Sequence, residues 1–455
     1  MDLSRKYIQE YIDRARLAQK KYESFSQEQV DEIVKVVAKT VYNNAEYLAE
    51  MAVKETGIGV YKDKVEKNKN KARMIYNSLR GKKSVGIIDR DEQTGITMVA
   101  KPMGIVAAIT PCTNPIATTM SNSMFSLKGR NVIVISPHHK AIVCCTKTVK
   151  MINEELKKIG APENLIQILS QQSRNNTRNL MSMADVVLAT GGMGIVHAAY
   201  SSGRPALGVG AGNVQCILDR DADLEDAIPK IIAGRCFDNG ILCAAEQNII
   251  APADRFDEII DLFRKNGTFF VTDPDQKKAF REAIFNDGAL SGHVIGKSVQ
   301  DIAALAGVEV PSDSKIIMIE ADGIGTKDIL SKEKMCPVMA AYRYNDFKEA
   351  VEIARKNLEV DGKGHSVSIH SNNKKNIEYA GNMLSVCRFL INQCCATGAG
   401  GSFFNGLAPT NTAGCGSWGH NSISENLTYK HLINLSRIAY FMKDNPVPTD
   451  EELWA

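Results

Sequence analysis

The sequence of 455 residues lacks an apolar stretch long enough to cross a membrane, and it lacks the apolar core of a signal peptide near its start. Residues 1–30 are charged and amphipathic instead. We therefore expect neither secretion nor a membrane partner, and the predicted location is the cytoplasm.

Cysteine is present, but not in the patterns of disulfide frameworks or metal sites. The 11 cysteines are an odd number, no C-x-x-C occurs, and no Cys/His cluster has the spacing of a zinc site. We therefore expect reduced thiols and no bound metal. The missing C-x-x-C also disfavours a thiol–disulfide oxidoreductase, which needs a resolving cysteine.

An excess of charge of either sign is also missing. The chain has 55 Lys and Arg residues against 52 Asp and Glu residues, which leaves a formal net charge of +3. This balance provides no electrostatic footprint for nucleic acid or for an anionic membrane. The chain is 44% hydrophobic and long enough for two or three packed domains, so we expect a globular protein that acts on small molecules.

Hydrophobic periodicity predicts an α/β protein. Residues 3–80 have helical spacing, with Gly57 placed to end one segment, and 96–104 alternate as in an extended arm after the polar interval 81–95. From Gly104 onward, short β-rich runs such as GIVAAIT, NVIVIS and DVVLAT alternate with helical segments. Such alternation indicates a parallel, doubly wound sheet with ligands beyond the carboxyl ends of its strands.

A second α/β region begins near Gly212. We expect a helix that includes residues 233–247, and strands at NIIAP, KIIMIE and MAAYRY. The Gly-, Ser- and Asn-rich segment 394–426 is too polar for a core, and its Cys and Trp residues favour an ordered active-site loop over a linker. Residues 433–441 form a candidate terminal strand.

A glycine-rich turn follows the apolar strand DVVLA. Thr190, Gly191 and Gly192 precede a helix-like segment, so backbone N–H groups and the helix N-terminus favour a phosphate there. The alternative is a tight strand-to-helix turn without a ligand, because the motif is not a full GxGxxG.

Cys243 is the candidate nucleophile. Most cysteines are buried small hydrophobes, but Cys243 has small neighbours, with Glu246 and Gln247 close by in the sequence. A thiol that attacks a carbonyl also needs donors for the oxygen that becomes negative. Asn114, just after the first parallel strand, is placed to supply one; its alternative role is helix N-capping before Pro115.

Seven motifs occur in one order along the chain: TPCTNP, ATGG, GVGAGN, NGILCAAEQ, KEKMCPV, GKGHS and GCGSWGHNSISEN. Together they resemble the aldehyde dehydrogenase superfamily, and within it the CoA-acylating branch. The resemblance is closest to the CoA-acylating succinate semialdehyde dehydrogenases. It implies an aldehyde dehydrogenase-like fold with a Rossmann-type cofactor domain, an α/β catalytic domain and a small oligomerisation arm.

The resemblance also implies roles for individual residues. Cys243 matches the nucleophile, Asn114 and the backbone N–H of Cys243 match the oxyanion hole, and Glu333 matches the acid that holds the nicotinamide ribose. Ser136, His138 and Lys140 fall where the family binds the adenine ribose. The cofactor-contacting positions implied are Thr110, Pro111, Ser136, His138, Lys140, Thr190, Gly191, Gly192, Gly208 and Glu333.

One departure separates this chain from the hydrolytic members of the superfamily. Gly208 stands where those enzymes carry the Glu that activates water against the thioester. Without that base, water is a slow nucleophile and a thiol such as that of CoA is favoured. His365 is the candidate acceptor for the thiol proton or a group that orients it; its alternative is a structural His, and Glu246 is a weaker candidate base.

A semialdehyde substrate brings a carboxylate, which needs a cation or several donors. Lys71 lies on an early helix that lines the family's substrate tunnel; its alternative is a solvated helix face. Further candidates for this contact are Arg204, Arg388, Gln393 and His420.

The expected reaction is the reversible conversion of succinyl-CoA and NADPH to succinate semialdehyde, CoA and NADP+. The alternative is an NAD-dependent acylating dehydrogenase for acetaldehyde, propionaldehyde or butyraldehyde. NADP(H) is favoured over NAD(H) by Lys140, which could meet a 2′-phosphate. An ordinary hydrolytic aldehyde dehydrogenase and a scaffold without turnover are competing hypotheses, although the intact Cys243, Asn114 and Glu333 argue against the scaffold.

The resemblance predicts three parts of the chain. Residues 1–83 and 102–212 form the cofactor-binding domain, and residues 213–428 form the catalytic domain. Residues 84–101 and 429–455 form an arm and tail for a homodimer or homotetramer.

Overall fold

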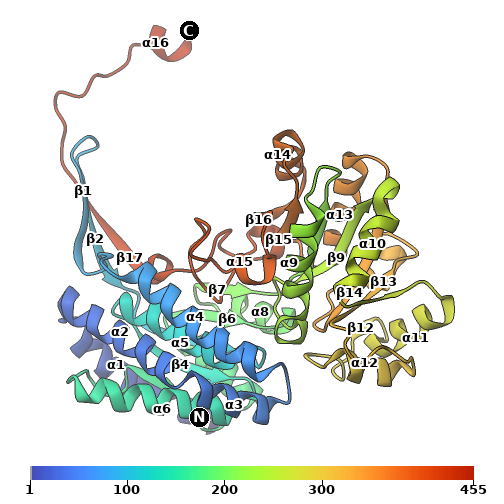
Figure 1. The fold of residues 1–455 in the computed structure, drawn as a ribbon. Helices are drawn as coiled ribbons and strands as arrows, with labels where there is room; N and C mark the ends of the chain where they lie inside the picture. Colours follow the sequence, from blue (N-terminus) through green and yellow to red (C-terminus); the bar gives the residue numbers. More distant parts are fainter. Residues whose placement is uncertain (1–2) are drawn as a thin grey trace.

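A computed structural model describes residues 3–455, which form two lobes and a projecting arm (Figure 1). The first lobe contains the helices α1 Leu3–Tyr22, α2 Gln27–Asn43, α3 Ala45–Thr56, α4 Tyr61–Leu79, α5 Pro115–Lys128, α6 Ile142–Lys158, α7 Arg174–Met183 and α8 Met193–Tyr200. Its sheet contains β3 Ile105–Thr110, β4 Val132–Pro137, β5 Ile166–Ile168, β6 Val186–Thr190 and β7 Ala206–Val209.

The five strands of this lobe run parallel in the order β5-β4-β3-β6-β7, as the strand–helix alternation predicts. Strands β3 and β4 are buried along their whole length because helices cover both faces of the sheet. The chain order reverses between β3 and β6, which makes their carboxyl ends the crevice where a doubly wound sheet binds its ligand. The turns after these two strands carry Asn114 and Gly191.

The second lobe is built on seven parallel strands in the order β10-β13-β14-β9-β8-β15-β16. These strands are β8 Val214–Leu218, β9 Glu246–Pro252, β10 Thr268–Val271, β13 Ile316–Glu320, β14 Val338–Tyr344, β15 Gly364–His370 and β16 Val386–Ile391. The helices of this lobe are α9 Leu224–Cys236, α10 Phe256–Lys265, α11 Pro274–Ile284, α12 Val299–Ala306, α13 Phe347–Val360, α14 Lys374–Met383 and α15 Cys395–Gly398, and β11 Phe285–Asn286 pairs with β12 Ala289–Leu290.

One sequence-based expectation for local structure is wrong. The helix expected to include 233–247 ends at Cys236, because Asp238, Asn239 and Gly240 adopt left-handed φ angles of 53°, 54° and 68° that no α-helix tolerates. The polar interval 81–95 contains the strand β1 Gly86–Asp91. Ile88 of this strand packs against the core of the first lobe, while most of its other side chains are at least partly exposed.

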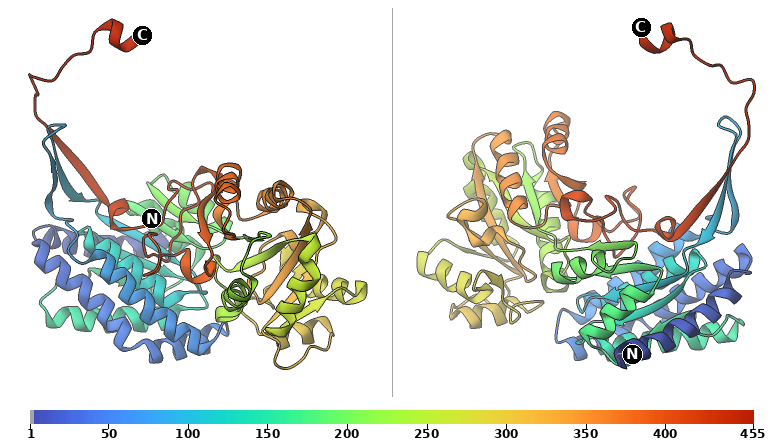
Figure 2. Two further views of the ribbon diagram at one scale, coloured as in Figure 1. Left: turned by 45° about the horizontal axis from the view of Figure 1, so that its top comes forward. Right: turned by 180° about the vertical axis from the view of Figure 1, so that it is seen from behind.

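The arm is a three-stranded antiparallel sheet in the order β1-β2-β17, formed by β1, β2 Ile96–Pro102 and β17 Ile433–Ala439. It projects from the first lobe, and the chain continues beyond it to α16 Asp450–Trp454 (Figures 1 and 2). Several apolar side chains of this region are exposed, among them Phe441 and Trp454.

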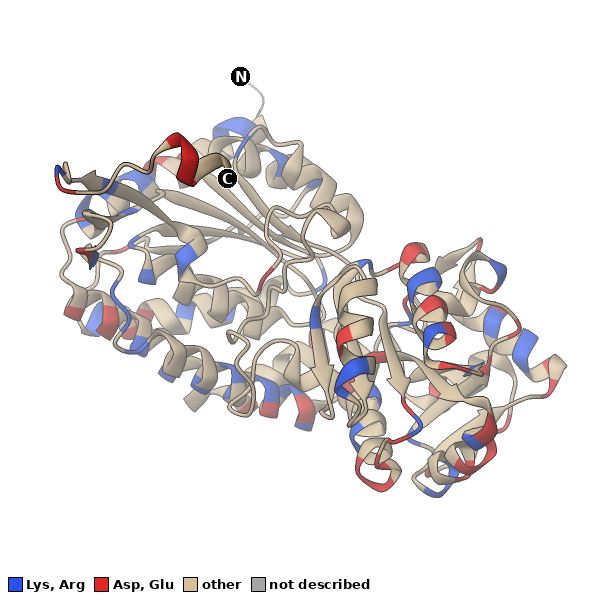
Figure 3. Ribbon diagram, turned by 90° about the horizontal axis from the view of Figure 1, so that it is seen from above, with Lys and Arg blue, Asp and Glu red and all other residues tan. Residues whose placement is uncertain are grey.

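The two lobes have separate hydrophobic cores, as they have separate sheets. One core joins the helices and strands up to Ala206 with Leu427–Ile433, and separate cores begin with Val214 and Cys216 in the second lobe. In the view of Figure 3, basic and acidic residues are interspersed over the helices. No helix within residues 3–455 is long and apolar enough to span a membrane.

Candidate active site

Cys243 lies between the 3₁₀ turn Phe237–Gly240 and strand β9, at the edge where strands of the second sheet begin. The left-handed turn places the residue where the two lobes meet, and Cys243 is partly exposed. Burial of the thiol and the nearby Glu333 raise the pKa of Cys243 to about 11, although Arg388 opposes the shift. The resting side chain is therefore a neutral thiol that needs a base.

His365 is the titratable residue that the structure places next to this thiol. Its Nε2 lies 3.2 Å from Cys243 Sγ, and the His365 side chain is buried at the start of β15. Burial and the Arg388 charge lower the pKa of His365 to about 3, so the imidazole is neutral at neutral pH. A neutral imidazole can accept the thiol proton. The structure thus brings together two residues that are 122 positions apart in the chain.

A serine and an arginine orient His365. Ser366 Oγ lies 3.0 Å from His365 Nδ1 and accepts a hydrogen bond of 3.1 Å from Arg388 Nε. The hydroxyl oxygen has a second lone pair for an Nδ1–H donor, and that tautomer leaves Nε2 free to accept from the thiol.

Arg388 is held entirely by protein acceptors, which disagrees with its prediction as a substrate contact. The buried guanidinium donates to Ser366 Oγ, to the Gly414 carbonyl at 2.7 Å, to the His365 carbonyl at 2.8 Å and to Asn426 Oδ1 at 3.3 Å. These bonds engage all of its nitrogens, so they leave little capacity for a substrate carboxylate.

Asn114 occupies the N-cap position of α5, but its side chain makes no capping hydrogen bond. The capping alternative is therefore wrong. Asn114 Oδ1 accepts from Lys67 Nζ, while Asn114 Nδ2 has only a contact of 3.5 Å with Thr113 Oγ1. The amide N–H thus remains available for an oxyanion in the crevice between the lobes.

Lys71 lies on the same face of α4, one turn after Lys67, and is partly buried. Its Nζ donates to the Gly400 carbonyl at 2.8 Å. Burial and the Lys67 charge lower the pKa of Lys71 to about 8, and its charge interacts with Cys243. A solvated helix face therefore does not describe Lys71, although it does describe Lys69, which pairs with Glu46.

The other predicted substrate contacts have different surroundings. Gln393 Oε1 accepts from Asn405 Nδ2 at 2.9 Å. His420 is exposed and has a left-handed φ of 56°. Arg204 is exposed before β7, at the edge where strands of the first sheet start, and donates to the Ser182 carbonyl at 2.9 Å. This position is at the wrong end of the strands for a ligand between the lobes.

The predicted cofactor positions divide into two groups. The first group lies at the switch point. Thr110 is the last residue of β3 and is followed by Pro111, and Thr190 is the last residue of β6 and is followed by Gly191 and Gly192. Gly192 is the N-cap of α8 without a side-chain cap, and a Cβ at Gly192 or Gly194 would meet nothing within 4 Å. This open, uncapped helix start fits a pyrophosphate.

The predicted adenine-ribose positions are less uniform. Ser136 is fully buried, and its hydroxyl bonds Thr177 Oγ1 at 2.9 Å and Gln172 Nε2 at 2.8 Å, so its side chain faces the protein interior rather than a ribose. His138 is half-buried and Lys140 is exposed beyond β4. Burial and the neighbouring His139 lower the pKa of His138 to about 4, so it is uncharged at neutral pH.

Gly208 has an aromatic ring where a longer side chain would lie. A Cβ there would sit 3.0 Å from the Tyr200 ring and 3.2 Å from Val196, and Tyr200 Oη bonds the Gly208 backbone N and O. A carboxylate at this position would require the ring to move. Two acids of this region are differently engaged: Glu333 accepts from Gly212 N at 3.1 Å, and Glu246 accepts from Cys395 N at 2.6 Å.

Burial raises the pKa of Glu246 to about 7 and that of Glu333 to about 8. Glu246 is fully buried and holds the start of α15, which fits a structural role better than that of a base for CoA. Residues 3–455 contain no group of three or more His, Cys, Asp and Glu side chains that could hold a metal ion.

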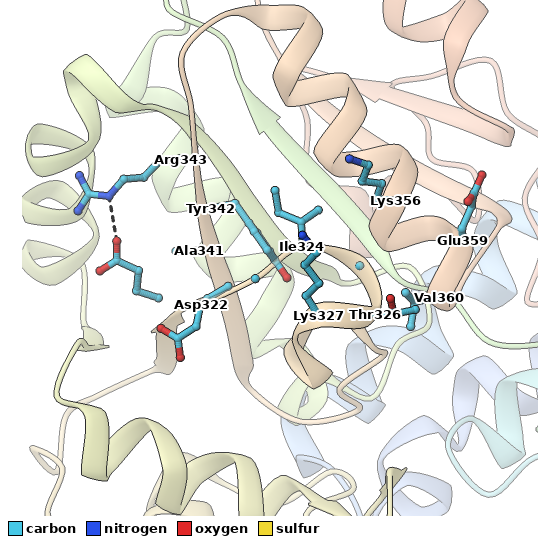
Figure 4. Close-up of a pocket in the computed structure, with 14 residues that line it drawn as sticks. Asp322, Ile324, Thr326, Lys327, Ala341, Tyr342, Arg343, Lys356, Glu359 and Val360 are labelled. Atoms are coloured by element: carbon cyan, nitrogen blue, oxygen red, sulfur yellow. Dashed lines mark hydrogen bonds and ion pairs between the residues drawn. The ribbon is translucent and has the colours of Figure 1, made fainter.

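A separate cavity of about 800 Å³ lies at the carboxyl ends of β13 and β14 (Figure 4). Tyr342, Asp322 and Lys327 line it, and Arg343 pairs with Glu320 at its edge. None of the candidate site residues lines this cavity, although its lining residue Val360 directly precedes Asp361, whose carboxylate accepts from Glu333 N at 3.2 Å.

Comparisons with known proteins agree with this geometry. The profile of the aldehyde dehydrogenase family matches residues 1–432. The chain belongs to the aldehyde dehydrogenase family. It is 54% identical over 447 residues to the succinate-semialdehyde dehydrogenase (acetylating) of Clostridium kluyveri, with 98% of each chain covered.

Solved structures of acylating aldehyde dehydrogenases share the fold. An acetylating aldehyde dehydrogenase from Geobacillus thermoglucosidasius superposes with a TM-score of 0.94 at 38% identity, and 98% of each chain is covered. A propionaldehyde dehydrogenase from Rhodopseudomonas palustris, with bound CoA and an acylated cysteine, has a TM-score of 0.85 at 27% identity, with 95% of this chain and 97% of that chain covered. An engineered glycolyl-CoA reductase with bound NADP+ has a TM-score of 0.84 at 28% identity, with 95% of this chain and 96% of that one covered. The chain is an acylating aldehyde dehydrogenase.

Sequence reasoning missed three polar residues of this dehydrogenase's site: Lys67, Asp238 and Ser366. The spacing of Lys64, Lys67 and Lys71 on one helical face is a signal that could have found Lys67. Ser366 stands next to His365 in the GKGHS motif, which is a local signal for it. Asp238 carries no comparable signal, because its partner Lys67 lies 171 positions away.

Proposed function

We propose that this enzyme interconverts succinyl-CoA and succinate semialdehyde through a thioester on Cys243, with NADP(H) as the hydride carrier and CoA as co-substrate. The observation that carries the proposal is the pair formed by Cys243 Sγ and His365 Nε2 at 3.2 Å, with Lys71 close enough to interact electrostatically with the same thiol. The reaction takes place in the cytoplasm, where the 11 free cysteines remain reduced.

In the oxidative direction, His365 Nε2 takes the proton from Cys243 while the sulfur bonds to the aldehyde carbon. Asn114 Nδ2 and the backbone N–H of Cys243 donate to the oxygen that becomes negative. NADP+, when bound at the switch point, supplies the acceptor for the hydride that leaves this carbon, and its phosphates fit Gly191, Gly192 and the start of α8. Glu333 is placed to bind the nicotinamide ribose. The acyl group then remains on Cys243 as a thioester.

CoA completes the reaction. His365 first releases the proton from Cys243 to solvent, and its free Nε2 then takes the proton of the CoA thiol as that sulfur attacks the thioester carbon. The Cys243 sulfur leaves as a thiolate, regains a proton from His365, and acyl-CoA is released. Water is a poor competitor, because Tyr200 occupies the space at Gly208 where a hydrolytic enzyme has its base. In the reverse direction, the same groups act in the opposite order and reduce succinyl-CoA.

Lys71 is the basis for a substrate that carries a second carboxylate. Within residues 3–455 no acidic side chain forms an ion pair with Lys71, and its bond to the Gly400 carbonyl leaves two further N–H donors. A carboxylate would restore the positive charge that burial disfavours. Succinyl and succinate semialdehyde groups place such a carboxylate at the end of a short chain.

The arm and tail are the basis for a homodimer or homotetramer. Ile438, Tyr440, Phe441, Val447 and Trp454 are exposed by 44%, 61%, 92%, 88% and 81%, which is costly for an isolated chain. A second copy that covers these side chains would bury them. Light scattering of the purified protein should therefore give at least the mass of a dimer, and Phe441→Asp should lower it.

A spectrophotometric assay tests the proposed function. NADPH or NADH oxidation is measured with succinyl-CoA, acetyl-CoA and butyryl-CoA, and Cys243→Ala serves as the inactive control. The highest kcat/KM is expected for succinyl-CoA with NADPH. A higher kcat/KM for acetyl-CoA or butyryl-CoA with NADH would instead establish the alternative, a dehydrogenase for neutral aldehydes.

A further inference from the structure

Lys67 and Asp238 form a buried charged cluster behind the oxyanion amide. Both side chains are almost completely buried, and Lys67 Nζ contacts Asp238 Oδ2 and Asn114 Oδ1 at the same time. Lys64 Nζ lies 3.1 Å from the same carboxylate oxygen. Within residues 3–455 none of these three charged residues hydrogen-bonds Cys243, so their effect on the reaction is exerted through Asn114.

The chemistry of the ammonium group decides how the Asn114 amide is oriented. An ammonium has three donors and no acceptor, so the amide oxygen must face Lys67 and the amide nitrogen must point away from it. No capping bond holds the Asn114 side chain, and its other contact is the 3.5 Å approach to Thr113. Lys67 is therefore the strong partner that selects the orientation in which Nδ2–H is free.

Asp238 links this amide to the chain that carries the nucleophile. It is fully buried five residues before Cys243 and adopts a left-handed φ of 53°. Its Oδ1 accepts from Val60 N at 2.7 Å, and its own N–H donates to Asp63 Oδ2 at 2.7 Å. The same carboxylate therefore fixes Lys67 on α4 and the turn that ends at Cys243.

A second lysine ties the oxyanion loop to this cluster. Lys64 Nζ donates to the Thr113 carbonyl at 3.2 Å, one residue before Asn114. Burial and the charge of Lys67 lower the pKa of Lys64 to about 8. The carboxylates of Asp238 and Asp63 balance the charges of Lys64 and Lys67, but it is the Lys67 ammonium that lies directly against the Asn114 oxygen, where it increases the strength of the N–H donor.

We propose that Lys67, anchored by Asp238, is the positioning residue that sets the orientation of the Asn114 amide and polarises it toward the oxyanion formed on Cys243. This inference rests on the proposed role of Cys243 and Asn114. It adds a residue that contacts neither substrate nor nucleophile and acts only when a carbonyl oxygen becomes negative.

Two reagents that use the same thiol separate this role from a structural one. With p-nitrophenyl acetate, Cys243 Sγ bonds to the ester carbon through an oxyanion, and nitrophenolate leaves as the acetyl thioester forms. With iodoacetamide, Sγ bonds to the methylene carbon as iodide leaves, and no oxyanion forms. The ratio of the ester rate to the alkylation rate at Cys243 therefore measures stabilisation of the oxyanion, because a change in thiol reactivity affects both rates.

The test measures this ratio in a double-mutant cycle, with nitrophenolate absorbance for one reaction and mass spectrometry of the Cys243 peptide for the other. Asn114→Ala should lower the ratio by about 100-fold, which is typical for removal of one oxyanion donor. Lys67→Met should lower it by about 10-fold through the lost orientation and charge. Lys67→Met combined with Asn114→Ala should fall no more than twofold below Asn114→Ala alone, because Lys67 then has no amide to orient.

Two results of this cycle would overturn the inference. The first is a Lys67→Met variant that slows both reactions equally, which is the signature of a structural defect. The second is a double variant whose ratio falls a further tenfold below Asn114→Ala. Lys69→Met, on the exposed side of the same helix, is the matched control and should leave both rates unchanged.

Asp238→Asn provides a second test that does not depend on the folding of Lys67→Met. Its amide oxygen can still accept from a lysine, but the charge that anchors Lys67 is lost. The ratio should fall, by less than in Lys67→Met, and an unchanged ratio would contradict the anchoring role. Neither reagent contains CoA, nicotinamide or a dicarboxylic acid, so the outcome is independent of the substrate; failure of succinyl-CoA reduction would instead contradict the proposed function.

Discussion

The two sheets meet at the active site with opposite ends, and they supply different kinds of groups. The first sheet presents carboxyl ends, where the turns after β3 and β6 provide Asn114, glycines and an uncapped helix start. The second sheet presents the amino ends of β9, β14 and β15, which carry Cys243, Glu333 and His365. The ends of β13 and β14 border the separate cavity of about 800 Å³ (Figure 4).

This difference shows how one crevice serves two tasks. At the first sheet, the backbone N–H groups after β6 suit phosphates and the Asn114 side-chain amide after β3 suits an oxyanion, because neither needs a change of protonation. Side chains at the second sheet handle bonds and protons, which require a thiol and an imidazole. The rule that ligands bind at the carboxyl ends of parallel strands holds for the first sheet alone.

Removal of the nucleophile should have the largest effect on the second sheet's task. Cys243→Ala should reduce turnover in both directions by about 10⁴-fold or more, because no other thiol has His365 as a partner. The first sheet is untouched, so the affinity for NADPH should stay near that of the wild type. Stopped-flow turnover and fluorescence titration measure the two quantities. Retained turnover would contradict the assignment.

Loss of the base should have the next largest effect. His365→Ala should lower kcat for acyl transfer to CoA by about 10²- to 10⁴-fold, the usual contribution of a general base. Ser366→Ala and Arg388→Met should each lower kcat by a smaller factor, because Ser366 and Arg388 only orient the imidazole. Alkaline pH, which ionises Cys243 directly, should partly restore acylation in His365→Ala. An activity of the His365→Ala variant equal to that of the wild type would exclude the pair as the reacting unit.

Substrate selection by Lys71 should give a smaller effect that depends on pH. Lys71→Ala should lower the kcat/KM ratio of succinyl-CoA to butyryl-CoA by about 10- to 100-fold, the value of a hydrogen bond to a charged group. In the wild type this ratio should fall as the pH rises through about 8, because the lowered pKa of Lys71 means that its positive charge is lost there. Lys71→Arg, which stays charged, should keep the ratio constant over this range.

Lys69→Ala is the control for the substrate test, because Lys69 lies on the same helix and pairs with Glu46 instead. It should leave the ratio unchanged. A ratio that is equal in Lys71→Ala and wild type would exclude Lys71 from substrate binding and would shift attention to Gln393 or to another donor.

An acid at position 208 should have the smallest effect on catalysis. Gly208→Glu places a Cβ 3.0 Å from Tyr200, so the ring must shift, and we expect a loss of stability of about 1–3 kcal/mol from overpacking. The displaced carboxylate is not expected to create a fast hydrolase. Thermal unfolding and release of free acid without CoA are the measurements, and rapid CoA-independent hydrolysis would show that only the missing base separates the two reaction classes.

Much of the first lobe and of the site could be predicted from the sequence. Continuous apolar runs at β3, β4 and β6 identify buried parallel strands, and the small residues around Cys243 distinguish it from the other cysteines. The predictions failed where distant residues decide the structure. Three consecutive left-handed residues end α9, held by Val60 and Asp63, which no local pattern reveals.

Arg388 illustrates the same limit. Its charge suggested a substrate contact, whereas the fold surrounds it with Ser366, Gly414 and Asn426. A charged residue can bind a ligand or satisfy buried carbonyls, and its sequence neighbours do not distinguish the two. Lys71 and Arg388 are both cations near Cys243, yet only Lys71 retains free donors.

The fate of the acyl group on Cys243 tests the central claim most directly. Enzyme mixed with succinate semialdehyde and NADP+ without CoA should give a burst of NADPH equal to the number of active sites, with a stable acyl adduct on the Cys243 peptide. Addition of CoA should then release succinyl-CoA and restart turnover. Continued NADPH formation with free succinate and no CoA would contradict the account.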